Sequence, residues 1–135
     1  MDQEELNQVM QIATNYFRSQ TSSEKEVERL LQSLAAVVQQ EGVKLVHLED
    51  YLFLVVVRGK GLVEVHTIGD QNNPRSLVKN FKTLLDYLKN IDVKVVYSYS
   101  PDQKFVRIAN MISPKMQQYE SIIDGKKMYV FVVEL

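Results

Sequence analysis

The stretch from Tyr51 to Ile68 reads YLFLVVVRGKGLVEVHTI, and it decides the fold. It contains two β-rich runs, Tyr51–Val57 and Leu62–Ile68, separated by the turn-forming segment RGKG. A third β-rich run, Val43–Leu48, comes directly before them, so the three runs predict an antiparallel meander. The middle run is apolar at nearly every position, and we therefore expect it to lie inside a sheet with both faces covered.

Four segments with helical periodicity flank this meander. Apolar residues recur with a 3.6-residue period between Leu6 and Phe17, which predicts a first helix. A second helix is expected to begin at a capping box of Ser23 and Glu26, with an apolar stripe that stops at Gly42. Asn73 and Pro74 give a polar cap followed by proline, which predicts a third helix ending near Asn90. Ser100 and Pro101 repeat this signal, and a short fourth helix follows with apolar residues at Phe105, Ile108, Ala109 and Ile112.

Three further strands complete the chain. Val93–Ser98 follows the third helix, and a strand, helix, strand unit of this length implies a parallel, right-handed crossover. Lys115–Ile123 and Lys126–Glu134 form a hairpin around Asp124-Gly125, a residue pair that tolerates the positive φ angles of a type I′ turn. The order is α-α-β-β-β-α-β-α-β-β. The sequence therefore predicts an α/β fold with a mixed, mostly antiparallel central sheet and helices on both faces.

Composition restricts the classes of protein to which the chain can belong. Its 135 residues, 45% of them hydrophobic, suit a single domain spanning residues 1–135. The sequence has no cysteine, which excludes disulfides, thiolate nucleophiles and cysteine-ligated zinc, and its two histidines show no metal-ligand spacing. The acidic start is unlike a signal peptide, and Tyr51–Val57 is far shorter than the roughly 18 apolar residues of a membrane span. We expect a cytoplasmic protein without a metal or a membrane span.

The charge is distributed unevenly along the chain. Residues 1–50 carry nine acids and four bases, whereas residues 51–135 carry eight acids and twelve bases. This mildly basic part could serve a phosphate-bearing ligand, but its lysines are scattered, which favours a solvated surface and gives no support to nucleic-acid binding. The apolar terminal strand Met128–Leu135 is expected to offer an edge to a second copy.

The order of these elements resembles the GNAT N-acetyltransferase superfamily over nearly the whole chain, without the family's usual first strand. The closest textual likeness lies within Val93–Met116, where VVYSYS and then PDQKFVRIANMI resemble the family's fifth strand, splayed junction and fourth helix. The small size of the chain and the strand VEVHT are most similar to acetyltransferase-like proteins of tailed bacteriophages, including virion-associated ones. The resemblance implies acetyl-CoA as the candidate cofactor.

The loop before the third helix departs from the family pattern. Family members bind the pyrophosphate of acyl-CoA with a Gln/Arg-x-x-Gly-x-Gly/Ala turn, but residues 68–75 here read IGDQNNPR. Fewer glycines place Cβ atoms where amides must approach the phosphates, and Asp70 adds a like charge, which predicts weakened acetyl-CoA binding. The candidate cofactor-binding residues are Gly69, Asn73 and Arg75, whose guanidinium could meet a phosphate, together with Ser100, which also suits a helix cap.

Two pairs of residues are candidates for acid–base chemistry. Glu64 and His66 lie two residues apart on one strand, so they share a face and occupy the position that the resemblance assigns to the general base. Alternatively, they only line a polar cleft. Tyr97 and Tyr99 are the candidate general acids that would reprotonate a departing thiolate, although alternating tyrosines on a strand also serve as packing residues.

Three functional interpretations follow. The first is a GNAT-like domain with weakened or lost catalysis that acts as a structural or interaction protein with a protein partner. The alternative is an active acyl-CoA-dependent N-acetyltransferase that acts on an amine and uses Glu64 or His66 as the base. The third is a binding module whose resemblance to the family is only architectural. The loop from Gly69 to Arg75 is the sequence feature that distinguishes these three interpretations.

Overall fold

A computed structural model describes residues 2–70 and 72–135 of the chain. Its helices and strands follow the order predicted from the sequence. They are α1 (Gln3–Gln20), α2 (Glu24–Val37), β1 (Val43–Leu48), β2 (Tyr51–Gly59), β3 (Leu62–Gly69), α3 (Pro74–Asn90), β4 (Val95–Ser100), α4 (Lys104–Ile112), β5 (Gln117–Ile123) and β6 (Lys126–Glu134).

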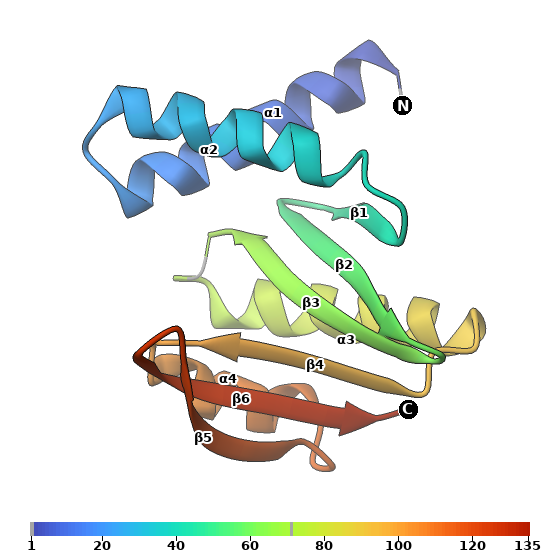
Figure 1. Ribbon diagram of the computed structural model, residues 1–135. Coiled ribbons are helices and arrows are strands. Elements are labelled where there is room, and N and C mark those ends of the chain that lie inside the picture. The colour runs from blue at the N-terminus through green and yellow to red at the C-terminus, as the bar shows by residue number, and fades with distance from the viewer. Residues whose placement is uncertain (1, 71) are drawn as a thin grey trace.

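The six strands form one sheet in the order β1-β2-β3-β4-β6-β5. All neighbouring strands are antiparallel except β3 and β4, which are parallel because α3 carries the chain across between them. In Figure 1, α1 and α2 pack side by side, and α3 and α4 lie behind the sheet. The predicted fold class, a mostly antiparallel mixed sheet with helices on both faces, is confirmed.

The strand β2 divides the core into two layers. Phe53 faces α3 in the larger apolar cluster, whereas its neighbour Leu52 packs with Val9 and Ala13 of α1 in the smaller one. The side chains of Leu52 and Phe53 are both completely buried, at 0% exposure. This strand is therefore interior and covered on both faces, as its continuous apolar run predicts.

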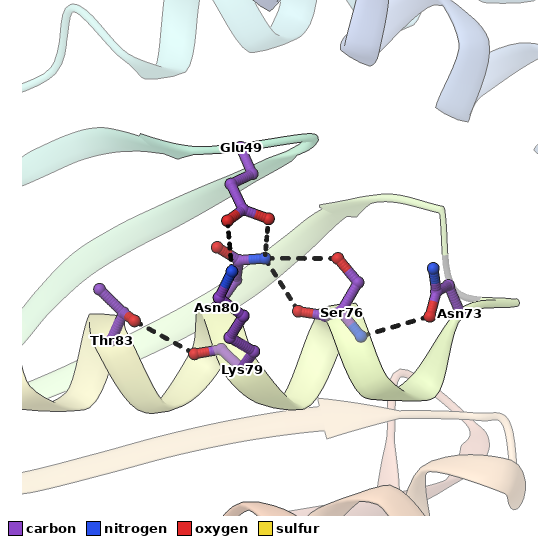
Figure 2. Close-up of polar contacts among 6 residues, drawn as sticks. All are labelled: Glu49, Asn73, Ser76, Lys79, Asn80 and Thr83. Atoms are coloured by element: carbon purple, nitrogen blue, oxygen red, sulfur yellow. Dashed lines mark hydrogen bonds and ion pairs between the residues drawn. The ribbon is translucent and has the colours of Figure 1, made fainter.

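The turn between β1 and β2 is tied to α3 by a polar cluster, which Figure 2 shows. Glu49 has a positive φ angle of 52°, and its carboxylate accepts hydrogen bonds from Lys79 Nζ at 2.8 Å and from Asn80 Nδ2 at 3.2 Å. Asn80 is buried and also donates to the Ser76 carbonyl at 2.9 Å. The hydrogen bonds from Lys79 and then Asn80 lower the pKa of Glu49. The cluster therefore links the β1–β2 turn to α3.

Several predicted boundaries are displaced. The strand expected from Val93 begins at Val95, because the Val93 amide donates to the Leu88 carbonyl at 3.0 Å and so belongs to the turn that ends α3. The helix expected after Ser100 begins only at Lys104. Ser100 is instead the last residue of β4. Its hydroxyl oxygen accepts a hydrogen bond from the Asp102 amide at 3.1 Å, so Ser100 stabilises the turn before α4 and is not the N-cap of the helix.

Two predictions concern the C-terminal hairpin. The turn is confirmed, since Asp124 and Gly125 have φ angles of 52° and 78°, as a type I′ turn requires. The prediction that the terminal strand forms an edge is wrong, because β6 is paired with β4 on one side and with β5 on the other. The edges of the sheet are β1 and β5. None of the helices in the described ranges has the length and apolar character that crossing a membrane requires.

Candidate functional site: the cavity between two diverging strands

The sheet opens between β3 and β4. Their parallel pairing covers only three residue pairs and ends at Glu64 and Tyr97, although β3 continues to Gly69 and β4 to Ser100. Beyond these pairs β3 stays with β2, and β4 stays with β6, so the two strands diverge towards the start of α3, as Figure 1 shows. The divergence leaves a gap in the middle of an otherwise continuous sheet.

A cavity of about 490 Å³ occupies this gap, which is within the size range of small-molecule sites. Both strands line it, together with α1, α3, α4 and β6. Its apolar lining consists mainly of Leu77, Phe81, Phe105, Ile108, Ile112, Met116 and Phe131. Its polar lining includes His66, Ser98, Tyr99 and Ser100. The cavity therefore has a mainly apolar lining on the α3–α4 side, whereas His66 and Tyr99 line its opposite side.

Glu64 lies at the apex of the divergence and is 5% exposed. Its carboxylate accepts hydrogen bonds from Tyr97 Oη at 2.8 Å and from the Arg58 guanidinium at 3.3 Å and 3.4 Å, and it contacts His66 Nε2. Burial raises the pKa of Glu64, but the hydrogen bonds from Tyr97, His66 and Arg58 together lower it below its usual value. Glu64 is thus an ionised carboxylate whose acceptor positions are occupied, which makes it a poor proton acceptor.

His66 links this carboxylate to the cavity. Its side chain is 32% exposed and lines the cavity, which Glu64 does not. If Nε2 donates its hydrogen to Glu64, the other ring nitrogen, Nδ1, carries the lone pair that can accept a proton. The structure therefore confirms that Glu64 and His66 lie together on one face. Of the two, His66 is the better placed to act as a base, with Glu64 orienting its ring.

The two candidate acids differ in position. Tyr97 points at Glu64 and is absent from the cavity lining, whereas Tyr99 lines the cavity and packs edge-to-face on His66, with ring centroids 5.3 Å apart. Burial, and then the charge of Glu64, raise the pKa of Tyr99, so its hydroxyl keeps its proton at neutral pH. Burial and the hydrogen bond to Glu64 raise the pKa of Tyr97 as well. Tyr99 is the only one of the two that a ligand in this cavity would meet.

Gly69, at the end of β3, has a steric role. Its φ angle is 152°, and an added Cβ would lie 2.7 Å from the Tyr51 ring and 2.8 Å from the Asp50 carbonyl oxygen. Tyr51 in turn donates from its hydroxyl to the Asp70 carbonyl at 2.7 Å. The backbone therefore runs directly over the Tyr51 ring, which requires glycine at this position. Gln71, which the sequence places in the same loop, lies outside the described residues.

The loop uses its own side chains to satisfy amides at the start of α3. The Asn72 amide donates to the Asp70 carboxylate at 2.9 Å, and the Ser76 amide donates to Asn73 Oδ1 at 3.3 Å. Pro74, at the first position of the helix, has no amide hydrogen. A helix N-terminus binds anions through such amides, and the loop occupies two of the amides in this region, those of Asn72 and Ser76, with a carboxylate and an amide oxygen. Asn73 is a helix cap in this structure.

Arg75 and Ser100 complete the list of predicted site residues. Arg75 is exposed in the first turn of α3, and no carboxylate in the described part of the chain forms an ion pair with it. Ser100 lines the cavity at the end of β4. The structure thus gathers His66, Tyr99 and Ser100 around one cavity, and places Asn73 and Arg75 outside its lining.

Sequence reasoning missed Arg58 and the contribution of α1. The sequence pattern places Arg58 only in the hairpin turn, but the pairing of Val56 with Glu64 brings the end of β2 beside that carboxylate. The register of the hairpin was the available signal. Tyr16 and Gln20 of α1 also line the cavity, and no local pattern in the sequence indicates this. In the described residues, histidine and acidic side chains form no group that could hold a metal ion.

No protein-family model matches the sequence, and no curated protein matches it. Several solved structures, however, are similar to this chain. A spermidine N-acetyltransferase from Vibrio cholerae is 12% identical with a TM-score of 0.65, over 99% of this chain and 92% of that chain. A ribosomal-protein-alanine N-acetyltransferase from Brucella melitensis is 11% identical with a TM-score of 0.65, over 100% and 97%. The N-acetyltransferase PseH from Campylobacter jejuni, in complex with acetyl coenzyme A, is 14% identical with a TM-score of 0.58, over 99% and 92%. The chain therefore has the fold of GNAT acetyltransferases.

Proposed function

We propose that this protein is a GNAT-fold domain in which CoA-dependent catalysis is weakened or lost, and that it acts as an interaction or structural protein. The loop before α3 carries the proposal. Asp70 and Asn73 accept hydrogen bonds from the Asn72 and Ser76 amides beside the start of α3, and a phosphate bound to these amides would meet the negative charge of Asp70. A ligand with two adjacent phosphates would have to displace these hydrogen bonds and approach a like charge.

The biological setting that we propose is a phage particle or the cytoplasm of the cell, with the chain acting as one domain over residues 1–135. The phage setting rests on the sequence resemblance alone, and the three structures named above come from bacteria. Its test is mass spectrometry of purified particles from the source of the sequence. Peptides of this chain at a constant ratio to the capsid protein are expected, and their absence from the particles would contradict a virion role.

The direct test of lost catalysis is isothermal titration of the purified protein with acetyl-CoA and with CoA. We expect no saturable binding at concentrations that detect a Kd near 100 μM, which corresponds to about −5.5 kcal/mol. Saturable binding by both ligands, together with transfer of the acetyl group to an amine, would overturn the proposal.

A specific observation favours a second candidate function, an active acyl-CoA-dependent N-acetyltransferase. His66 is paired with Glu64 and lines the cavity next to the Tyr99 ring, which places a candidate base and a candidate acid side by side. In such a reaction the amine nitrogen attacks the thioester carbonyl, His66 Nδ1 takes the proton of the amine, and Tyr99 protonates the departing thiolate. The acyl carbon thereby exchanges its bond to sulfur for a bond to nitrogen.

Thiol release from acetyl-CoA, measured with a panel of amines that includes polyamines, tests this second function. If it operates, His66→Ala lowers the turnover by about 10²–10⁴-fold, the usual contribution of a general base. Matched variants at His47, which lies outside the cavity lining, are expected to leave turnover unchanged. Unaltered protein that releases no thiol above the background rate would exclude the second function.

A further inference from the structure

The strand β5 forms a free edge of the sheet, since it pairs with β6 on one side only. Figure 1 shows it at the lower margin of the sheet, beyond β6. Its pairing with β6 runs through seven residue pairs without a shift in register. Proteins protect such edges with a lysine, a proline or a bulge that prevents further pairing, and β5 has none of these.

The other edge strand, β1, differs from β5 in this respect. It carries the exposed Lys44, whereas the one charged residue of β5 is Glu120, which pairs with Lys127 of the same chain at 3.5 Å. β5 also exposes two apolar side chains, since Tyr119 is 53% exposed and Ile122 is 70% exposed. Of the two edges, β5 is therefore the one that suits pairing with a further strand.

The hairpin turn fixes which backbone groups of β5 are free. A type I′ turn closes with a hydrogen bond between its first and last residues, so Ile123 and Lys126 form a hydrogen-bonded pair. Hydrogen-bonded and non-hydrogen-bonded pairs alternate along an antiparallel ladder. The N–H and C=O groups of Glu120 and Ile122 therefore point away from β6 and are directed to the outer side of the edge.

The two faces of β5 have different surroundings. The Gln118 side-chain amide donates to the Val106 carbonyl of α4 at 3.2 Å, so Gln118 lies on the α4 side of the sheet. Since side chains alternate along a strand, Tyr119, Ser121 and Ile123 lie on the opposite face. A strand that pairs with β5 would thus meet an aromatic and a β-branched side chain on that face.

A second copy of β5 supplies the side chains that complement these. In an antiparallel pair with its twofold axis at Ser121, Tyr119 of each copy lies opposite Ile123 of the other, and Glu120 lies opposite Ile122. Aromatic and β-branched residues are a favourable cross-strand pair, and symmetry forms this pair twice. No two like charges face each other in this register, whereas an axis at Glu120 would oppose two carboxylates.

We propose that the protein forms a homodimer in which the β5 strands of two copies pair antiparallel about a twofold axis at Ser121. The pairing joins the two sheets into one and covers the exposed apolar residues of β5. An interface built on one pair of strands is small, so we expect a Kd of about 1–100 μM. The inference goes beyond the proposed function, because it holds whether or not the protein binds CoA.

The test is analytical ultracentrifugation of the unaltered full chain between about 1 μM and 1 mM, without CoA. Ser121→Lys and Ser121→Glu each place a charge against its own copy at the axis, so each is expected to raise the Kd at least about fivefold. An equimolar mixture of the two variants brings opposite charges together and is expected to associate about as well as the unaltered chain. The matched control, Ser33→Lys on the exposed side of α2, should leave the Kd unchanged.

Amide hydrogen exchange locates the interface without a substitution. The amides of Glu120 and Ile122 are expected to exchange at least about fivefold more slowly at the highest protein concentration than at the lowest, because pairing supplies their acceptors. Thermal unfolding reports whether each Ser121 variant folds, and if one does not, the exchange measurement alone decides.

Four results would overturn the inference. They are a chain that stays monomeric up to about 1 mM, a dimer that both charged variants leave intact, a mixture that associates no better than either variant alone, and unchanged exchange of the Glu120 and Ile122 amides on association. Binding of CoA is measured separately. A chain that neither associates nor binds CoA would therefore refute this inference and leave the proposed loss of catalysis standing.

Discussion

Replacing Glu64 with glutamine should destabilise the protein, since this carboxylate is the most completely buried charge among the described residues. The amide retains the shape of the side chain but loses its charge, and its NH₂ group would face donors at Tyr97, Arg58 or His66. Removing one partner of a buried pair costs about 3–5 kcal/mol. Because the Arg58 side chain is 50% exposed and regains solvation, we expect about 2–3 kcal/mol for Glu64→Gln.

The measurement is urea unfolding at neutral pH, supported by thermal unfolding, in which the variant should melt about 6–10 °C lower. The matched control is Glu120→Gln on β5, whose carboxylate is 64% exposed and contacts Lys127 at 3.5 Å, and which should change stability by at most about 0.5 kcal/mol. A loss below about 0.5 kcal/mol in Glu64→Gln, equal to the control, would refute the reasoning that this cluster holds the apex of the gap together.

The same variant carries a pH dependence. The folded-state pKa of Glu64 lies below its ordinary value of 4.5, so its stabilising contribution is complete above about pH 4.5 and disappears as the pH falls through the lowered folded-state pKa. Glu64→Gln removes a group that titrates in this window. The difference in stability between the two proteins should therefore shrink as the solution is acidified, and a difference that grows below that pH would contradict the assignment of an ionised carboxylate.

The remaining predictions concern the loop and α3. Gly69→Ala should destabilise the protein by about 1–3 kcal/mol in urea unfolding, because its Cβ would press on Tyr51 in a backbone conformation that favours glycine; a neutral effect would contradict the steric role. Asn80→Ala should cost about 1–3 kcal/mol, since it removes the buried donor to Glu49 and Ser76, and an unchanged denaturation midpoint would count against that cluster. Asp70→Ala should give saturable CoA binding in calorimetry, with a Kd below about 100 μM, where the unaltered protein gives none, because it frees the Asn72 amide and removes a like charge; a variant that also gives no saturable heat would count against Asp70 as the block to phosphate binding.

The sequence predicts those features that depend on neighbouring residues. The Ser23 and Asn73 caps and the Asp124-Gly125 turn are short-range patterns, and the structure contains all three. The wrong prediction for the start of α4 has the same origin. Ser100 and Pro101 suit a turn as well as a helix start, and only the packing of the chain at the end of β4 selects between them.

The parts of the site that sequence reasoning missed depend on long-range contacts. Arg58 reaches Glu64 because of the register between β2 and β3, and Tyr16 reaches the cavity because α1 packs over the sheet. The interior position of β6 likewise follows from which strands pair, because β6 lies between β4 and β5. The residues of an apolar strand do not by themselves show which strands will flank it. Pairing Glu64 with His66 was accessible from their spacing, but the choice of His66 as the better base required the three donors around Glu64.

The measurement that tests the central claim most directly is the titration of the unaltered protein with acetyl-CoA, followed by calorimetry and by thiol release in the presence of amines. The account predicts no saturable heat for a Kd near 100 μM and no thiol release above background, because Asp70 and Asn73 accept hydrogen bonds from the Asn72 and Ser76 amides and Asp70 adds a negative charge there. Saturable binding with transfer of the acetyl group would contradict it and would assign the cavity between β3 and β4 to an active acetyltransferase.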